Sequence, residues 1–186
     1  MTPKAIGWPF IRFRLDKIFT MSNRDWSKFI VRINIGARRS DLYDAWTTKA
    51  GMEYWFLRSC EFVDAKGYIL DEEETIRAGC TYTFFWHGYT DAVFEKGEIL
   101  EANGQDRIVF RFGKAGICTV RILMVGDEQI VEIEQAEIPT DEHSQFQYHV
   151  GCKTGWTFYL TNLKSLFEGG IDLRNRDINL QDMLNS

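Results

Sequence analysis

Apolar and polar residues alternate along much of the chain, a pattern typical of β-strands that turn one face toward a core. The first such segment is residues 28–35, where apolar side chains occupy every second position from Phe29 onward. Six later segments alternate in this way or are rich in β-branched and aromatic residues: 60–65, 80–87, 92–101, 106–112, 117–125 and 129–138. The last two meet at Gly126-Asp127-Glu128 and are predicted to form a hairpin. Glutamates alternate with Val131 and Ile133 in the second strand of this hairpin, which predicts one solvent-exposed face and one buried face.

Two short helices are predicted between the first and second strands. Ser40 and Asp41 are residue types that cap helix N-termini, and they precede an apolar series with helical spacing. Thr47-Thr48 separates this helix from the next one. The apolar residues expected to face the core from the two helices are Leu42, Ala45, Trp46, Met52, Trp55 and Phe56.

After the last strand, the sequence predicts a polar loop and then one long amphipathic helix. The loop is expected at residues 139–143 and the helix at residues 148–168. The apolar stripe of this helix comprises Trp156, Tyr159, Leu160, Leu163, Leu166 and Phe167. Gly169-Gly170 is a typical helix end. Residues 171–186 are polar and are expected to be loosely held.

The order of these elements predicts an α+β fold built on an antiparallel sheet. One strand and two helices are followed by six strands in succession, and hairpin connections favour antiparallel pairing over a βαβ arrangement. A sheet of this size curls, so the long helix is expected to lie across its concave face. The 186 residues fit one domain, and they contain no internal repeat.

The first twenty residues differ from the rest because they are basic and apolar, whereas the remainder is acidic. Pro9 and several charges interrupt the apolar run that a signal peptide needs, so export is not expected. Our hypothesis is that the working protein starts at Met21. The alternative is an arm that docks on a protein surface or a membrane face, with an edge strand at residues 10–15. We accordingly divide the chain into an extension over 1–24, a domain over 25–174 and a polar tail over 175–186.

Composition narrows the class of partner. The net charge of −5 and the pI of about 5.3 argue against nucleic acid, which requires a basic surface. No window approaches the apolar length of a membrane span. The four cysteines are far apart and form no C-x-x-C pair, so they are interpreted as reduced thiols of a cytoplasmic protein. Aromatic residues make up 15% of the chain, which fits either a filled core or an apolar pocket.

Few residues offer reactive chemistry. His143 lies in an acidic loop. His87 ends a strong strand and could act as an acid or base near neutral pH, although such a histidine is more often a surface or hydrogen-bonded residue. His149-x-x-Cys152 has the spacing of a metal-ligand pair but lacks a second pair. The acidic run Asp71–Glu74 is interpreted as part of a solvated loop over residues 66–79. We therefore predict no catalytic residue, no metal and no cofactor.

Two segments resemble a known family. Asp41-Leu-Tyr-Asp-Ala-Trp-Thr-Thr48 followed by Gly51-Met-Glu-Tyr-Trp-Phe56 is similar to the opening helices of the START/Bet v 1-like superfamily, with Trp46 and Trp55 at its aromatic positions. The stretch Gly155–Leu173, with its Gly-Trp start and Glu-Gly-Gly end, resembles the closing helix of the bacterial homologues of the activator of heat-shock-protein-90 ATPase. The resemblance covers roughly residues 27–174. The stretch 66–79 is longer and more acidic than the glycine-rich turn of the family pattern, so the cavity entrance is expected to differ.

The resemblance implies a helix-grip fold, in which a curved sheet wraps the last helix and a cavity lies between them. The residues expected to line this cavity are Trp46, Trp55, Tyr82, Phe84, Trp86, Phe110, Phe112, Trp156, Tyr159, Leu160 and Leu163. Arg111 and Arg121 could hold an anionic group if they faced inward, but outward positions are the more usual ones.

Three functions stay open at this point, because a fold alone does not select among them. The first is a non-catalytic module that binds a small apolar or amphipathic ligand. The second is a protein-interaction module that regulates a chaperone ATPase, as a monomer or a homodimer. The third is an enzyme of the cyclase or hydrolase type that uses the same cavity, with His87 as a candidate acid or base.

Overall fold

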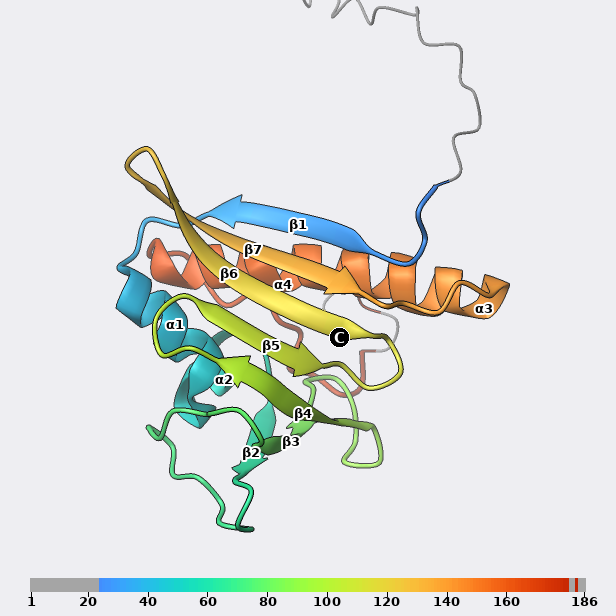
Figure 1. Cartoon of the computed structure of the whole chain (residues 1–186), viewed down its shortest axis with the longest axis horizontal. Helices are drawn as coiled ribbons and strands as arrows, with labels where there is room; N and C mark the ends of the chain where they lie inside the picture. Colours follow the sequence, from blue (N-terminus) through green and yellow to red (C-terminus); the bar gives the residue numbers. More distant parts are fainter. Residues whose placement is uncertain (1–23, 181–182, 184–186) are drawn as a thin grey trace, which may run out of the picture.

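The computed structural model describes residues 24–180 and 183, and it shows an antiparallel sheet curved around a long helix (Figure 1). The strands are β1 (Phe29–Asn34), β2 (Ser59–Val63), β3 (Thr81–Phe85), β4 (Phe94–Ala102), β5 (Arg107–Arg111), β6 (Ile117–Val125) and β7 (Glu128–Ala136). Their order in the sheet is β1-β7-β6-β5-β4-β3-β2. The α+β helix-grip prediction is therefore confirmed. The proposed start at Met21 and the edge strand at residues 10–15 lie outside the described residues.

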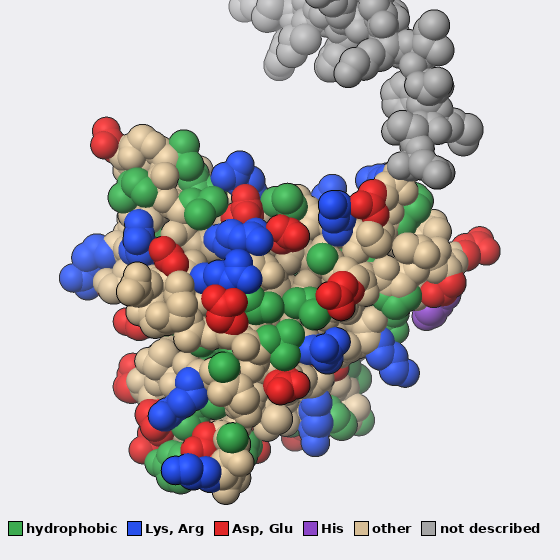
Figure 2. All heavy atoms as spheres, viewed as in Figure 1, with side chains coloured by type: hydrophobic (Ala, Val, Ile, Leu, Met, Phe, Trp, Pro, Cys, Tyr) green, Lys and Arg blue, Asp and Glu red, His purple; other side chains and the backbone are tan. Residues whose placement is uncertain are grey.

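The two faces of the sheet differ as the alternating pattern predicts. On the concave face, Val131 and Ile133 are fully buried. On the outer face, Arg121 lies 2.9 Å from Glu132 and 3.0 Å from Glu134. Figure 2 shows basic and acidic side chains interspersed over this outer face. Arg121 thus points away from the core, and Arg111 is exposed, so neither arginine reaches the interior.

Helices α1 (Arg39–Thr47) and α2 (Lys49–Trp55) lie where the sequence predicts them. The expected cap is wrong, however. The N-cap of α1 is Arg38, whose guanidinium pairs with Asp41 at 2.8 Å, so Ser40 and Asp41 lie inside the first turn. An acidic residue in that turn favours the helix dipole without capping it. The cap of α2 is made by Thr48, whose hydroxyl oxygen accepts a hydrogen bond from the Gly51 amide.

The long helix begins earlier than the sequence predicts. It comprises α3 (Glu142–Ser144), a π-helical segment η1 (Gln145–Val150) and α4 (Gly151–Phe167), so the loop expected at residues 139–143 is partly helical. Asp141 caps it by accepting a hydrogen bond from the Ser144 amide. The π-helical segment widens the turn and breaks the 3.6-residue period, which explains why the apolar pattern did not show the first two turns. No helix of the described residues is long and apolar enough to cross a membrane.

The segment after the helix is held firmly, contrary to expectation for residues 171–174. The Arg174 guanidinium donates hydrogen bonds to the main-chain oxygens of Glu53, Tyr54 and Leu57 at the end of α2. It also pairs with Asp172 at 2.7 Å, and its side chain is only 2% exposed. Burial alone would raise the pKa of Asp172, but hydrogen bonds from the two nearby arginines outweigh that effect and lower it well below its ordinary value.

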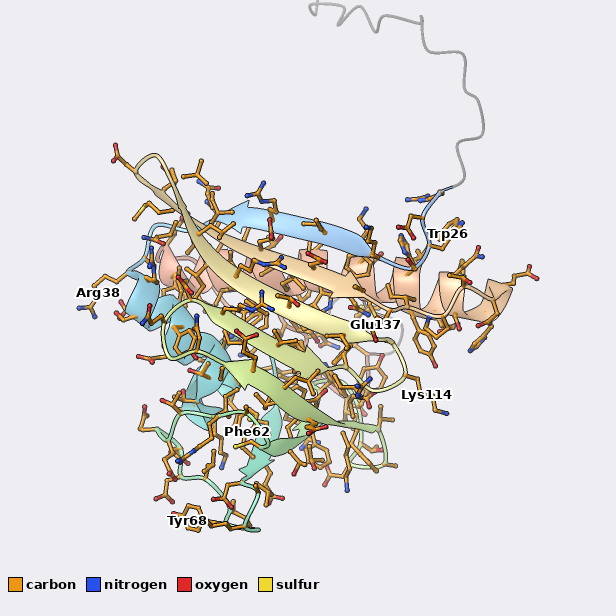
Figure 3. The ribbon with its side chains drawn as sticks, in the orientation of Figure 1. Trp26, Arg38, Phe62, Tyr68, Lys114 and Glu137 are labelled. Carbon is orange, nitrogen blue, oxygen red and sulfur yellow. The ribbon has the colours of Figure 1, made fainter. Side chains whose placement is uncertain are left out.

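The acidic connection between β2 and β3 has two anchors despite its polar composition. Leu70 and Ile76 are each 4% exposed and pack on the core, while the intervening acidic residues are solvated. Tyr68 lies at the tip of this connection, away from the sheet (Figure 3). The sequence interpretation of a solvated loop therefore holds for the acidic residues and misses the two anchors.

Candidate ligand-binding pocket

A pocket of about 190 Å³ lies between the first turns of α4 and one end of the sheet. It is lined by Phe56, Trp86, Phe112, Gln147, Gly151, Cys152, Gly155, Trp156 and Tyr159. Gln147 and Gly151 are exposed, so the pocket opens to solvent beside the long helix. The β2–β3 connection contributes no lining residue, so its unusual length does not shape this opening.

Aromatic rings reach the pocket from the ends of separate elements. Phe56 directly follows α2, Trp86 directly follows β3 and Phe112 directly follows β5. Trp86 contacts the Phe56 ring, and Phe112 contacts Trp156 of α4. The Phe56 ring centroid lies 5.1 Å from that of Trp156 and 4.7 Å from that of Tyr159, both on α4. Rings held in edge-on and tilted contacts form a preformed apolar wall.

A buried amide holds one wall in place. Gln135 on β7 is fully buried, and its Oε1 accepts a hydrogen bond from Trp156 Nε1 at 2.8 Å. The same oxygen lies 3.4 Å from Cys118 Sγ, and Gln135 Nε2 donates to the Ala115 carbonyl oxygen at 2.8 Å. Because unpaired buried amide atoms are costly, this network fixes the orientation of the Trp156 indole.

The polar groups of the pocket wall are neutral at physiological pH. Burial raises the pKa of the Cys152 thiol, and it raises the pKa of the Tyr159 hydroxyl strongly. Gln147 contributes an uncharged amide. An uncharged, largely aromatic wall suits an apolar molecule or the apolar part of a larger one.

The structure separates the eleven sequence-predicted lining residues into two groups. Trp86, Phe112, Trp156 and Tyr159 lie at the pocket. The other seven belong to the packed core and are at most 4% exposed: Trp46, Trp55, Tyr82, Phe84, Phe110, Leu160 and Leu163. The core group contains one buried donor without a hydrogen-bond partner among the described residues, Trp46 Nε1, which packs against Trp55 and Trp156.

Sequence reasoning missed five lining residues: Phe56, Gln147, Gly151, Cys152 and Gly155. The sequence predicts Phe56 in a helix that faces the core, and Gln147 lies in the π-helical segment, which the apolar pattern does not predict. The i, i+4 spacing of Gly151 and Gly155 on one helix face was the available signal. Glycines on a helix face leave room beside the helix, and apart from the adjoining residues and backbone of α4 itself no atom lies within 4 Å of a Cβ placed on Gly155.

The three histidines lie outside the pocket lining. His149 is buried, and its Nδ1 is 3.0 Å from the Trp26 carbonyl oxygen, so it connects the segment before β1 to the long helix. Trp26 is labelled in Figure 3. His87 follows Trp86, and burial together with nearby arginines lowers its pKa to about 4. His143 is exposed at the start of the helix. Among residues 24–180 and 183, no group of three or more His, Cys, Asp and Glu side chains is arranged to hold a metal ion.

A curved antiparallel sheet closed by a long C-terminal helix, with a pocket between the two, defines a helix-grip protein. A family model described as activator of Hsp90 ATPase homolog 1-like protein matches residues 36–168, and the chain belongs to this family. The family resemblance stated from the sequence is thereby confirmed. No match was found among proteins with curated descriptions.

Several solved structures share the fold. The Aha1 dimer from Colwellia psychrerythraea has a TM-score of 0.58 and 16% identity, covering 77% of this chain and 97% of that one. Protein SSP2350 from Staphylococcus saprophyticus has a TM-score of 0.60 and 18% identity, covering 79% and 96%. DynU16, from the dynemicin biosynthetic locus, has a TM-score of 0.57 and 15% identity, covering 76% of this chain and 47% of that one. At these identities the likeness concerns the fold alone.

Proposed function

We propose that this protein binds a small apolar or amphipathic molecule, without transforming it, in the pocket between α4 and the sheet. The observation that carries the proposal is the wall itself: five aromatic side chains and three neutral polar groups surround a space that opens to solvent. Family membership supports a ligand-binding module in general terms. Ligand sites are typically concave and apolar, with a few polar groups that orient the ligand.

The size of the pocket limits the ligand. Its volume of about 190 Å³ is below the roughly 300–1,000 Å³ of sites for drug-sized molecules and above the ~150 Å³ cavity that accommodates benzene. One or two rings fit, and a longer ligand would extend through the opening beside Gln147.

The state of the titratable groups favours binding over catalysis in this pocket. A catalytic thiol needs a lowered pKa and an adjacent base, whereas burial raises the pKa of Cys152. Tyr159 is likewise held in its protonated form. These groups are suited to donating hydrogen bonds to a ligand.

A variant that fills the pocket tests the proposal. A side chain at position 155 meets free space, so Gly155→Leu should occupy the pocket without disturbing the helix. We expect it to weaken binding of the neutral probe naphthalene-2-carboxamide at least tenfold, measured by isothermal titration calorimetry and by quenching of tryptophan fluorescence. Thr161→Leu places the same side chain at an exposed position of α4 and should bind the probe like the wild type. Equal affinities for all three proteins would overturn the proposal.

A second function, docking of a protein partner, is favoured by one surface. Phe146 is 70% exposed and Val150 is 39% exposed, and together with Trp26 they border a shallow depression of about 260 Å³. Exposed apolar side chains that cluster in this way often mark interaction sites. If a second copy of the chain docks here, Phe146→Ser should shift the sedimentation equilibrium toward monomer. A monomeric wild-type protein would exclude this partner.

A further inference from the structure

Two arginines bond to the main chain beside the pocket residues Phe56 and Trp86, and a third arginine shares a carboxylate with one of them. Arg58 follows the pocket residue Phe56 by two positions, and its Nε donates to the Trp86 carbonyl oxygen at 3.2 Å. Arg174 and Arg176 come from the C-terminal segment, which runs behind the sheet toward the β3–β4 loop (Figure 1). Arg174 donates a hydrogen bond to the carbonyl oxygen of Leu57, which directly follows the pocket residue Phe56, and Arg176 pairs with the carboxylate of Asp172 that Arg174 also binds. Segments far apart in the sequence thus bring positive charge to one rim of an uncharged pocket.

The positive charge at this rim exceeds the negative charge. The three guanidiniums are paired with two carboxylates, because Arg58 binds Asp91 while Arg174 and Arg176 share Asp172. Burial and then the charges of Arg174 and Arg176 lower the pKa of His87 to about 4, which is consistent with a positive local potential. Within residues 24–180 and 183, one of the three guanidinium charges is therefore left without a paired carboxylate of its own.

The three arginines differ in how many of their guanidinium donors are already hydrogen-bonded within the protein. All five N–H donors of a guanidinium are engaged at Arg174, which binds Asp172 and three main-chain oxygens. Arg176 is 63% exposed and bonds only Asp172 among the described residues, and Arg58 is 35% exposed. The partner of Arg58, Asp91, is 81% exposed, so the pair is a weakly held surface ion pair that an incoming anion can replace. Arg58 and Arg176 are therefore available to a ligand, and Arg174 is not.

We propose that the ligand of this pocket is a carboxylic acid, whose apolar body lies against Trp86 and Tyr159 and whose carboxylate is bound by Arg58 and Arg176 at the rim. This inference rests on the proposed function and deepens it by specifying the class of ligand. Planar guanidinium groups match a carboxylate with paired hydrogen bonds, which gives direction as well as affinity. The rim thus selects an amphipathic acid over a neutral hydrocarbon of the same shape.

A matched pair of probes tests the inference. Naphthalene-2-carboxylate and naphthalene-2-carboxamide share their shape and differ in charge. Isothermal titration calorimetry at pH 7.4 gives the ratio of their affinities, and we expect the carboxylate to bind at least tenfold more tightly to the wild type, as one charge-assisted hydrogen bond implies. The ratio should fall toward one in Arg176→Gln and in Arg58→Gln, and it should fall in 0.5 M salt. Arg111→Gln, on the outer face of the sheet, should keep the wild-type ratio.

The outcomes separate the two proposals. A wild-type ratio near one, with both probes bound and both displaced by Gly155→Leu, would overturn the carboxylate site and leave the apolar pocket standing. A high ratio that neither Arg58→Gln nor Arg176→Gln reduces would place the anion elsewhere and would also overturn it. Absence of binding by both probes would overturn the pocket function and this inference with it.

Discussion

Replacement of Arg174 by methionine tests how the C-terminal segment stabilises the fold. Methionine keeps most of the volume of the side chain and removes the guanidinium. In the wild type this group binds the main-chain oxygens of Glu53, Tyr54 and Leu57 and the carboxylate of Asp172. The variant therefore removes these donors from the end of α2 and leaves Asp172 with the main-chain amide of residue 174 and the exposed Arg176 as partners.

The expected loss follows from the burial of the pair. The Arg174 side chain is 2% exposed and that of Asp172 is 19% exposed. Breaking a buried ion pair by removing one partner costs about 3–5 kcal/mol, a large part of the roughly 5–15 kcal/mol that stabilises a domain. The matched control is Arg111→Met on the exposed face of the sheet, where the change should stay within about 0.5 kcal/mol.

Urea unfolding followed by tryptophan fluorescence measures the free energy of unfolding of both variants. With a slope of about 2 kcal/mol per molar urea, the midpoint of Arg174→Met should fall by roughly 1.5–2.5 M. A loss below about 1 kcal/mol with an unchanged slope would refute the reasoning, because it would mean that water replaces the guanidinium at these carbonyls and that the segment is not docked in solution.

Two further predictions concern steric room and pH. Gly97→Ala should destabilise the fold by about 1–3 kcal/mol, because its Cβ would lie 2.2 Å from the Arg111 carbonyl oxygen and 2.4 Å from the Tyr82 hydroxyl. The Cβ of Gly155→Ala meets no such neighbour within 4 Å, so this variant should stabilise α4 by up to about 1 kcal/mol. Thermal unfolding compares the two variants, and similar shifts of the melting temperature would contradict the packing at Gly97. The pKa of His87 falls from 6.5 to about 4 on folding, so between these pH values the unfolded chain binds a proton that the folded chain does not. The free energy of unfolding should therefore decrease as the pH drops from 6.5 to about 4, with a slope of at most about 1.4 kcal/mol per pH unit. His87→Asn should remove this component of the slope, which urea titrations at several pH values would detect; identical profiles would refute it.

Local patterns determined the secondary structure and the fold class. Burial of one face of an element produces the period of two along each strand and the helical stripe from Trp156 to Phe167. Such a pattern involves only residues close together in the sequence, so the sequence alone predicts it. The order of the elements then left antiparallel hairpins as the simple arrangement, and the strand order β1-β7-β6-β5-β4-β3-β2 agrees with it. The sequence did not predict the correct start of the long helix, because a π-helical segment at residues 145–150 interrupts the helical period.

The distinction between core and pocket was decided by the tertiary structure. Phe110 and Phe112 have the same side chain and the same strand parity, yet Phe110 is packed in the core and Phe112 lines the pocket, because only the latter lies at the sheet end where α4 carries Gly151 and Gly155. The apolar pattern of a sequence predicts that a side chain is buried. It does not predict whether the buried side chain packs against other protein atoms or against a ligand. Likewise, Arg174 belongs to the stretch 171–186 that the sequence predicts to be loosely held, and its burial follows from carbonyl groups 117 to 121 positions away. Contacts between distant segments depend on how the sheet curves and where the helix lies, and no local period encodes that geometry.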